Sequence, residues 1–388
     1  MKHLIACISW LFLTVPVFAQ NVGVGTATPD PSAKVEISSN NSGLLIPRMT
    51  TAERNAISSP ATGLLIYNSD TNSLDMWNGT VWLSFSASGL LNNGVPMGPT
   101  CFGVWSQKAD IPTTARSMST AFSIGSKAYF TCGFDVANKK DFWEFDPANG
   151  KWTQKADFPG TARNFAVSFT IGSKGYIGLG TDASGRRNDF WEYDTITGNW
   201  TQLADFGGTP RAGAIGFSIN GKGYAGLGYD GADRLDFWEY DPLLNTWTQK
   251  ADFAGVARST PVGFSIGNKG YAGTGQLSST GSFRKDFWEF DPVANTWTAR
   301  LDFPGVARVG ATGFSIGNKG YIGLGVTTGN SLRKDFFEFD PATNTWVQKM
   351  DFGGTARNNA MSFVLNNKAY IGFGTDPGVR KDFWEYCQ

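Results

Sequence analysis

Six arginines recur in the second part of the chain, each 13 residues before a tyrosine: Arg116, Arg163, Arg211, Arg258, Arg308 and Arg357. A guanidinium is a planar, bidentate donor that suits carboxylates. Two sets of aspartates also recur, one from Asp110 to Asp351 and one from Asp141 to Asp382. Twelve carboxylates for six guanidiniums favour structural ion pairs, repeated as part of the scaffold.

The sequence offers little for catalysis. Its one histidine, His3, lies in a segment that we expect to be removed, which excludes His-based acid–base chemistry, catalytic triads and His metal sites. A glutamate recurs in every repeat, as at Glu192, and this sameness favours structural pairing across neighbouring repeat units, or blades, over catalysis. Asp230, Asp233 and Asp236 lack a full calcium-ligand pattern. We therefore predict no catalytic residue, no metal site and no cofactor.

Short strands must position the arginines. The tryptophans Trp105, Trp152, Trp200, Trp247, Trp297 and Trp346 are 47, 48, 47, 50 and 49 residues apart. Each interval holds four strand-like runs; in one copy they cover residues 165–170, 175–180, 189–194 and 200–203. A period of about 40–50 residues with four strands per unit is typical of a β-propeller.

Residues 101–388 resemble the kelch repeat family. The resemblance rests on the Arg of the first strand, the Tyr and glycines of the second, the Trp-Glu-Tyr-Asp run of the third and the Trp of the fourth. Kelch glycines are usually adjacent, whereas here they are split, as at Gly178 and Gly180. The resemblance implies an all-β fold, a six-bladed kelch-like β-propeller, in which arginines at this place can bind acidic ligands.

The sixth copy ends without its Trp strand, and an extra Trp strand at residues 102–108 precedes the first copy. We therefore expect the strand of Trp105 to complete the last blade and close the ring. Cys387 takes the place of the Asp that follows the third strand in complete repeats, and Cys101 lies four residues before Trp105. This places the two cysteines within reach of a disulfide. Cys132 is expected to be a buried free thiol.

The N-terminal part divides into a signal peptide at 1–19, cleaved after Ala19, a small β-rich module at 20–83 and a Gly/Ser/Pro-rich linker at 84–100. Strands are expected at 35–37, 44–46, 64–67, 74–77 and 81–83, with a short capped helix at 51–56. The module resembles N-terminal modules of exported Bacteroidetes proteins and of fibre-like surface proteins, through residues 21–26, 45–50 and 61–68. That resemblance implies a secreted or cell-surface protein and a possible homo-oligomer formed through the module. A simple spacer is an equally good interpretation.

The loops between the second and third strands vary in length and content, at 134–140, 181–188, 229–235, 276–285, 326–334 and 375–381. Variable loops on a repeated scaffold are where recognition usually occurs. The residue after each Arg also varies, and includes Asn164 and Asn358. We therefore expect a ligand face formed by these loops, the six arginines, Asn164 and Asn358.

Three functions stay open. The favoured one is a non-enzymatic, exported binding or adhesion protein for a glycan or a protein. A sugar-active enzyme like the sialic-acid mutarotases of the kelch family, or a purely structural spacer, are the alternatives. Lys+Arg and Asp+Glu both number 33, so no global charge favours nucleic acid. No run after the signal approaches the about 20 apolar residues of a membrane span.

Overall fold

The computed structural model describes residues 22–28, 30, 32–86, 89–92, 95–96 and 103–388. The predicted signal peptide at 1–19, its cleavage after Ala19 and Cys101 lie outside the described residues. The chain divides into two compact units, residues 1–100 and 101–388. In the described part, no helix is both long and apolar enough to cross a membrane.

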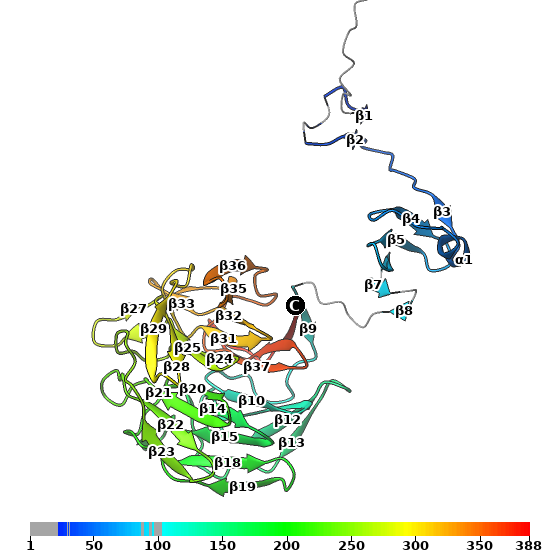
Figure 1. Ribbon diagram of the computed structural model, residues 1–388. Helices are drawn as coiled ribbons and strands as arrows, with labels where there is room; N and C mark the ends of the chain where they lie inside the picture. Colours follow the sequence, from blue (N-terminus) through cyan, green and yellow to red (C-terminus); the bar gives the residue numbers. More distant parts are fainter. Residues whose placement is uncertain (1–21, 29, 31, 87–88, 93–94, 97–102) are drawn as a thin grey trace, which may run out of the picture. The chain divides into compact units, whose positions relative to one another are not determined.

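The described residues of unit 1 form two small sheets (Figure 1). The first pairs β1 (Val22–Val24) with β2 (Val35–Ile37) in parallel. The second has the order β3-β4-β5-β6-β7-β8. Its strands are β3 (Arg48–Met49), β4 (Leu65–Asn68), β5 (Ser73–Trp77), β6 (Trp82–Ser86), β7 (Gly89–Asn92) and β8 (Val95–Pro96).

The helix predicted at 51–56 is confirmed as α1 (Thr51–Asn55). Thr50 caps it, since its hydroxyl accepts from the backbone N–H of Glu53 while the Glu53 carboxylate accepts from the backbone N–H of Thr50. The helix also delivers Arg54 into the interior, where Nη1 lies 2.6 Å from Oδ2 of Asp75 on β5. This buried ion pair fixes the short helix against the sheet.

Two expectations for unit 1 are corrected. Residues 44–46 form no strand, and because Leu44 and Leu45 are 67% and 79% exposed, this apolar run gains no burial that would hold it in a sheet. Strands β7 and β8 lie within residues 84–100, for which a linker was predicted. The Gly/Ser/Pro-rich composition of this segment predicted a linker. Strands β6 and β7 nevertheless pair through backbone hydrogen bonds, which require no alternation of apolar side chains.

Unit 2 consists mainly of six four-stranded antiparallel sheets, numbered here in chain order of their first strands. Sheet 1 contains β10 (Thr120–Ile124), β11 (Lys127–Thr131), β12 (Phe142–Asp146) and β13 (Lys151–Lys155). Sheet 2 contains β14 (Val167–Ile171), β15 (Lys174–Gly178), β18 (Phe190–Asp194) and β19 (Asn199–Gln202). Sheet 3 contains β20 (Ile215–Ile219), β21 (Lys222–Gly226), β22 (Phe237–Asp241) and β23 (Thr246–Gln249).

Sheet 4 contains β24 (Val262–Ile266), β25 (Lys269–Gly273), β28 (Phe287–Asp291) and β29 (Thr296–Arg300). Sheet 5 contains β31 (Thr312–Ile316), β32 (Lys319–Gly323), β35 (Phe336–Asp340) and β36 (Thr345–Lys349). Sheet 6 contains β37 (Met361–Leu365), β38 (Lys368–Gly372), β41 (Phe383–Cys387) and β9 (Val104–Lys108). The predicted placement of the Trp105 strand is therefore confirmed: Trp105 lies opposite Tyr386.

The first strands of the sheets lie side by side in the order β10, β14, β20, β24, β31, β37, and β37 also lies beside β10. Figure 1 shows these strands toward the middle of unit 2 and the fourth strands, such as β19 and β36, toward its edge. The arrangement is all-β and propeller-like.

Aromatic rings fill the spaces between neighbouring sheets. Phe122 of sheet 1 lies where a side chain on Gly175 of sheet 2 would be, since an added Cβ would come within 2.1 Å of its ring. Gly178, one of the split glycines, also makes room for an aromatic ring, because a Cβ on Gly178 would lie 2.1 Å from the ring of Phe190. The other, Gly180, has φ +92°, a conformation that glycine adopts without steric cost.

Short hairpins extend four of the loops between second and third strands. They are β16 (Thr181–Asp182) with β17 (Gly185–Arg186), β26 (Gln276–Leu277) with β27 (Ser282–Phe283), β33 (Val326–Thr327) with β34 (Ser331–Leu332), and β39 (Thr375–Asp376) with β40 (Gly378–Val379). The third of these hairpins is extended by β30 (Arg308–Val309), which pairs with β33 to give a three-stranded sheet. The loops are thus tied by backbone hydrogen bonds to the residues that follow each repeated Arg.

Candidate functional site

Each repeated arginine is buried and forms a bidentate ion pair with the aspartate just before the third strand. The pairs are Arg116–Asp141, Arg163–Asp189, Arg211–Asp236, Arg258–Asp286, Arg308–Asp335 and Arg357–Asp382, and their N···O distances are 2.5–2.8 Å. The arginines are only 0–1% exposed. Of the two aspartate sets that the sequence left open, the one beginning with Asp141 is the partner.

All five N–H donors of Arg163 have acceptors. Nη1 donates to Asp189 and to the carbonyl of Leu179 at 3.1 Å, and Nη2 donates to Asp189 and to the Thr161 hydroxyl. Nε donates to the Thr161 carbonyl at 3.0 Å. The guanidinium also lies over the Phe158 ring, 5.2 Å from its centre. This side chain therefore has no donor left for a ligand.

Burial by itself would raise the pKa of Asp189, but the hydrogen bonds from Arg163 and Trp191 outweigh it and leave that pKa below its ordinary value. The same causes lower the pKa of Asp141, Asp236, Asp286 and Asp382. These carboxylates are held ionised as fixed partners of the arginines. The geometry thus places the six arginines, predicted as ligand-binding residues, in the interior as structural ion pairs, because their charges are already neutralised there.

The repeated glutamates have structural partners too. The hydroxyl of Tyr176 donates to Glu192 at 2.8 Å, and Nζ of Lys174 lies 2.5 Å from the same carboxylate. Equivalent Tyr–Glu hydrogen bonds occur at Tyr224, Tyr271, Tyr321 and Tyr370. Each links the second strand to the third within one sheet, as at Tyr176 and Glu192, so the predicted pairing across blades is wrong. The two side chains meet because their residues lie opposite each other in adjacent strands.

A channel runs along the first strands, with cavities of about 200 and 220 Å³. Its described lining is made of Gly, Ala, Ser, Thr, Pro, Phe, Met and aliphatic side chains, with no ionisable group among them. A sugar-active enzyme in this channel would need an acid or base there. The lining gives no support to that alternative.

The mouth of the channel is formed by the residues two positions after each Arg: Met118, Phe165, Gly213, Thr260, Gly310 and Asn359. All six have left-handed backbone conformations, with φ between 50° and 62°. Backbone hydrogen bonds join neighbours, as from Phe165 N to Met118 O at 3.1 Å and from Met118 N to Asn359 O at 3.1 Å. The second of these joins sheet 6 to sheet 1. Sequence reasoning missed this ring, because only two of its members are glycines.

Asn164 and Asn358, predicted to face a ligand, lie between the arginines and the loops. Asn164 is 9% exposed, and its Nδ2 donates to Oδ1 of Asn138 in the loop of sheet 1. Asn358 pairs through its backbone with Thr375 of the loop of sheet 6. Its buried Oδ1 has no hydrogen-bond partner among the described residues. The Asn164 side chain and the Asn358 backbone thus each hold a loop in place.

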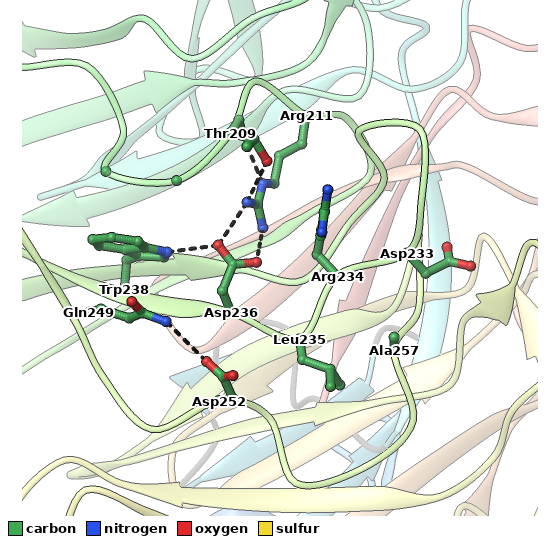
Figure 2. Close-up of a pocket in the computed structure, with 12 residues that line it drawn as sticks. Thr209, Arg211, Asp233, Arg234, Leu235, Asp236, Trp238, Gln249, Asp252 and Ala257 are labelled. Carbon is green, nitrogen blue, oxygen red and sulfur yellow. Dashed lines mark hydrogen bonds and ion pairs between the residues drawn. The ribbon is translucent and has the colours of Figure 1, made fainter.

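A pocket of about 630 Å³ opens on the loop side of sheet 3 (Figure 2). Figure 2 shows Arg211 and Trp238 both directed at Asp236, with Arg234, Asp233 and Asp252 around the opening. Asp230 and Asp233, which were considered above as calcium ligands, interact with protein groups. Asp230 pairs with Arg234 at 2.7 Å, and Asp233 accepts from the backbone N–H and hydroxyl of Ser278.

Residues 23–96 match the family model described as "Phage tail like trimerisation region". A search of curated proteins finds no match. Among solved structures, the chain is similar to the one titled "Structure of YjhT", with 17% identity and a TM-score of 0.61 over 71% of this chain and 95% of that chain. YjhT is a kelch-type propeller. At this identity the likeness concerns the fold alone, and it supports a kelch-like β-propeller for unit 2.

Proposed function

We propose that this is an exported, non-enzymatic binding protein, in which a closed six-bladed kelch-like propeller recognises a glycan or protein through its loop face. The observation that carries the proposal is the contrast between interior and loops. The Arg–Asp pairs are repeated with the same geometry in all six sheets, whereas the loops that cover them differ in length and charge. Variation confined to one face of a repeated scaffold is typical of recognition.

The N-terminal unit supports multivalent display as a homotrimer at the cell surface or in secreted form. Its match to a trimerisation region covers residues 23–96. Val22, Val24, Val35 and Ile37 on β1 and β2 are 44–61% exposed, and apolar side chains at this density suit burial between copies. Three linked propellers would raise the avidity for a repetitive ligand without any new contact.

A binding experiment tests the proposal on the chain from Gln20 to Gln388. The protein is applied to a glycan array and to immobilised surface proteins, beside a variant whose sheet 4 loop, residues 276–285, is replaced by the sheet 3 loop, residues 229–235. A control variant carries substitutions in the turn at Asn149 and Gly150, which joins β12 to β13. Binding that the loop exchange abolishes and the turn variant retains supports the proposal. Absence of any binding by the folded protein favours the structural-spacer alternative.

The oligomeric state is tested separately by sedimentation of the same protein. We expect a mass three times that of the chain. A Val24→Asp/Ile37→Asp variant places charges on β1 and β2 and is expected to sediment as a monomer while the melting transition of the propeller is unchanged. A wild-type monomer at all concentrations contradicts the trimer and leaves the loop-face proposal to its own test.

A further inference from the structure

In four of the six loops, a basic residue at the end of the loop pairs with an aspartate at its start. The pairs are Lys139–Asp135 at 2.9 Å, Arg187–Asp182 at 2.5 Å, Arg234–Asp230 at 2.7 Å, and Arg380–Asp376. These carboxylates are only 5–13% exposed. Each of these loops thus supplies a carboxylate to the basic residue at this position.

The loops of sheets 4 and 5 lack this ion pair. They keep the basic residue, as Arg284 and Arg333, but the aspartate position holds Leu277 in one and Thr327 in the other. In the part of the chain that the structure describes, no carboxylate lies within 4.0 Å of either guanidinium. The buried Nε of Arg284 has no hydrogen-bond partner there, and Nε of Arg333 reaches only the Thr327 hydroxyl, at 3.3 Å.

A second position changes in the same two sheets. Where the aspartate is present, a threonine two residues before the repeated Arg also bonds to it, as Thr209 does to Asp230 at 2.5 Å. In sheets 4 and 5 this threonine is replaced by Val256 and Val306, which are 42% and 51% exposed. The acceptor and its hydroxyl partner are therefore lost together, and the threonine position of both sheets holds an exposed aliphatic side chain.

The two arginines belong to neighbouring parts of one rim. The backbone of Arg284 pairs with that of Arg308, and Arg308 pairs with Thr327 on β33. Two strand spacings of about 4.8 Å place Arg284 and Thr327 about 10 Å apart. Thr327 in turn accepts from Arg333. We call Val256, Leu277, Arg284, Val306 and Arg333 the basic rim.

We propose that the basic rim binds an extended peptide segment in which two carboxylates flank aliphatic side chains; this names a ligand class for the proposed loop-face function and rests on it. The ligand carboxylates supply to Arg284 and Arg333 the acceptors that the other four loops supply themselves. An extended peptide in the polyproline II conformation has 3 residues per turn and rises about 3.1 Å per residue. Acids at positions i and i+3 then lie on one side of the peptide, about 9 Å apart, and match the two arginines. The residues between them contact Val256 and Val306, which a hydroxyl-rich saccharide would not favour.

The test uses a fluorescein-labelled peptide Gly-Glu-Val-Val-Glu-Gly and the chain from Gln20 to Gln388, with binding followed by fluorescence polarisation at low salt. A peptide with both Glu replaced by Gln has the same shape without the charges. We expect the acidic peptide to bind at least ten-fold more tightly than the neutral one, and its affinity to fall as salt is added.

Matched protein variants locate the site. Arg284→Gln/Arg333→Gln is expected to weaken peptide binding at least ten-fold. The control variant Arg187→Gln/Arg234→Gln is expected to change it less than two-fold, because in the wild type these two arginines already pair with carboxylates of the protein. The variant Val256→Thr/Leu277→Asp/Val306→Thr/Thr327→Asp converts sheets 4 and 5 to the pattern of the others. It is expected to lose peptide binding while keeping or raising its melting temperature, which separates loss of the site from loss of the fold.

Equal effects of the two arginine pairs, or no preference for the acidic peptide, overturn the basic rim as a peptide site. Preferential binding of an acidic polysaccharide such as polygalacturonate, lost in Arg284→Gln/Arg333→Gln, overturns the peptide assignment. Either result leaves the loop-face proposal standing if the array experiment shows binding that depends on the loops. If neither peptide nor array binds, the proposed function fails together with this inference.

Discussion

The guanidinium of Arg163 donates from Nη1 to the carbonyl oxygen of Leu179 at 3.1 Å, and Leu179 has the left-handed φ of 61°. The five equivalent residues have φ between 56° and 65°, and each carbonyl lies 2.9–3.2 Å from its arginine. Such a φ costs a non-glycine residue on the order of 1 kcal/mol. The ion pair therefore holds a backbone conformation from which the variable loop begins, and so connects the constant interior to the recognition face.

We predict that Arg163→Met destabilises the protein by about 3 kcal/mol, because it leaves the Asp189 carboxylate buried without its cation. Its midpoint of urea unfolding is compared with that of the wild type. Lys174→Gln is the control, since Lys174 is 39% exposed where it pairs with Glu192, and exposed pairs contribute less than about 1 kcal/mol.

The double variant Arg163→Met/Asp189→Asn measures the interaction between the two side chains. If the two residues act as a pair, the double variant is less destabilised than the sum of the two single variants. Additive effects, or an Arg163→Met protein as stable as wild type, would contradict a structural role and restore Arg163 as a candidate ligand donor.

Stability is predicted to fall in acid between about pH 4 and pH 2. Burial would raise the pKa of Asp182 and Asp230, but hydrogen bonds, first those from Arg187 and Arg234, lower each to about 2. A carboxyl whose folded-state pKa lies below its unfolded value stabilises the fold above the unfolded pKa, near 4, and loses that contribution as the pH falls through the folded value. The melting temperature should therefore be constant from pH 7 to 5 and decline below pH 4.

The comparison variant for the acid transition is Asp182→Asn/Asp230→Asn. It is expected to melt at a lower temperature at pH 7 and to show a smaller decline between pH 4 and pH 2, because two titrating groups are gone. The same decline in both proteins would show that these two loop pairs do not contribute to the pH dependence.

The repeat allowed much of the fold to be predicted. The constant spacing from Arg163 to Tyr176 fixed which strand follows which, and the extra strand of Trp105 predicted the pairing of β9 with β41. The partner of each arginine could not be chosen from sequence, because both aspartate sets recur with the arginines. Only the backbone path at Leu179 and the burial of the guanidinium decide between them.

The candidate site was less predictable. The basic rim left a signal in the sequence, since Leu277 and Thr327 replace an aspartate that the other four copies share. The substitution could be interpreted only from the structure, which shows that Arg187 and Arg234 pair with aspartates whereas Arg284 and Arg333 do not. The left-handed ring at Met118 and Phe165 left no signal, because their side chains do not favour positive φ.

We predict that Cys101 and Cys387 form a disulfide. Cys387 is buried at the end of β41, and the backbone N–H of Gly103, two residues after Cys101 in sequence, donates to its carbonyl at 2.8 Å. Cys132 is a buried free thiol, as expected, and burial raises its pKa to about 12. The mature chain unfolded without reductant should therefore bind one equivalent of iodoacetamide, and three after reduction.

The disulfide prediction also has a stability test. The bond would close a span of 286 residues, for which chain entropy gives at most about 5–6 kcal/mol. Cys387→Ser is expected to lower the melting temperature, and a reducing agent should lower the wild-type value by a similar amount. Three alkylated cysteines before reduction would falsify the bridge.

The indole of the third strand supplies a further donor to the buried carboxylate, and one sheet lacks it. Trp191 Nε1 donates to Asp189 at 2.7 Å, whereas sheet 5 has Phe337 at the equivalent position. We predict that Trp191→Phe destabilises the protein by about 1–2 kcal/mol, because a hydrogen bond to a charged group is lost. Phe337→Trp is expected to gain up to about 1 kcal/mol.

The local sequence shows why the larger ring should fit in sheet 5. The loop below Trp191 reads Asp-Phe-Pro-Gly at 157–160, and the loop below Phe337 has the same four residues at 302–305. Both rings meet a phenylalanine edge-on, Phe158 at 6.0 Å and Phe303 at 5.2 Å between ring centres. Urea unfolding of both variants measures the difference. A destabilised Phe337→Trp would mean that the closer ring spacing of sheet 5 has no room for an indole, and that the hydrogen bond does not offset the overpacking.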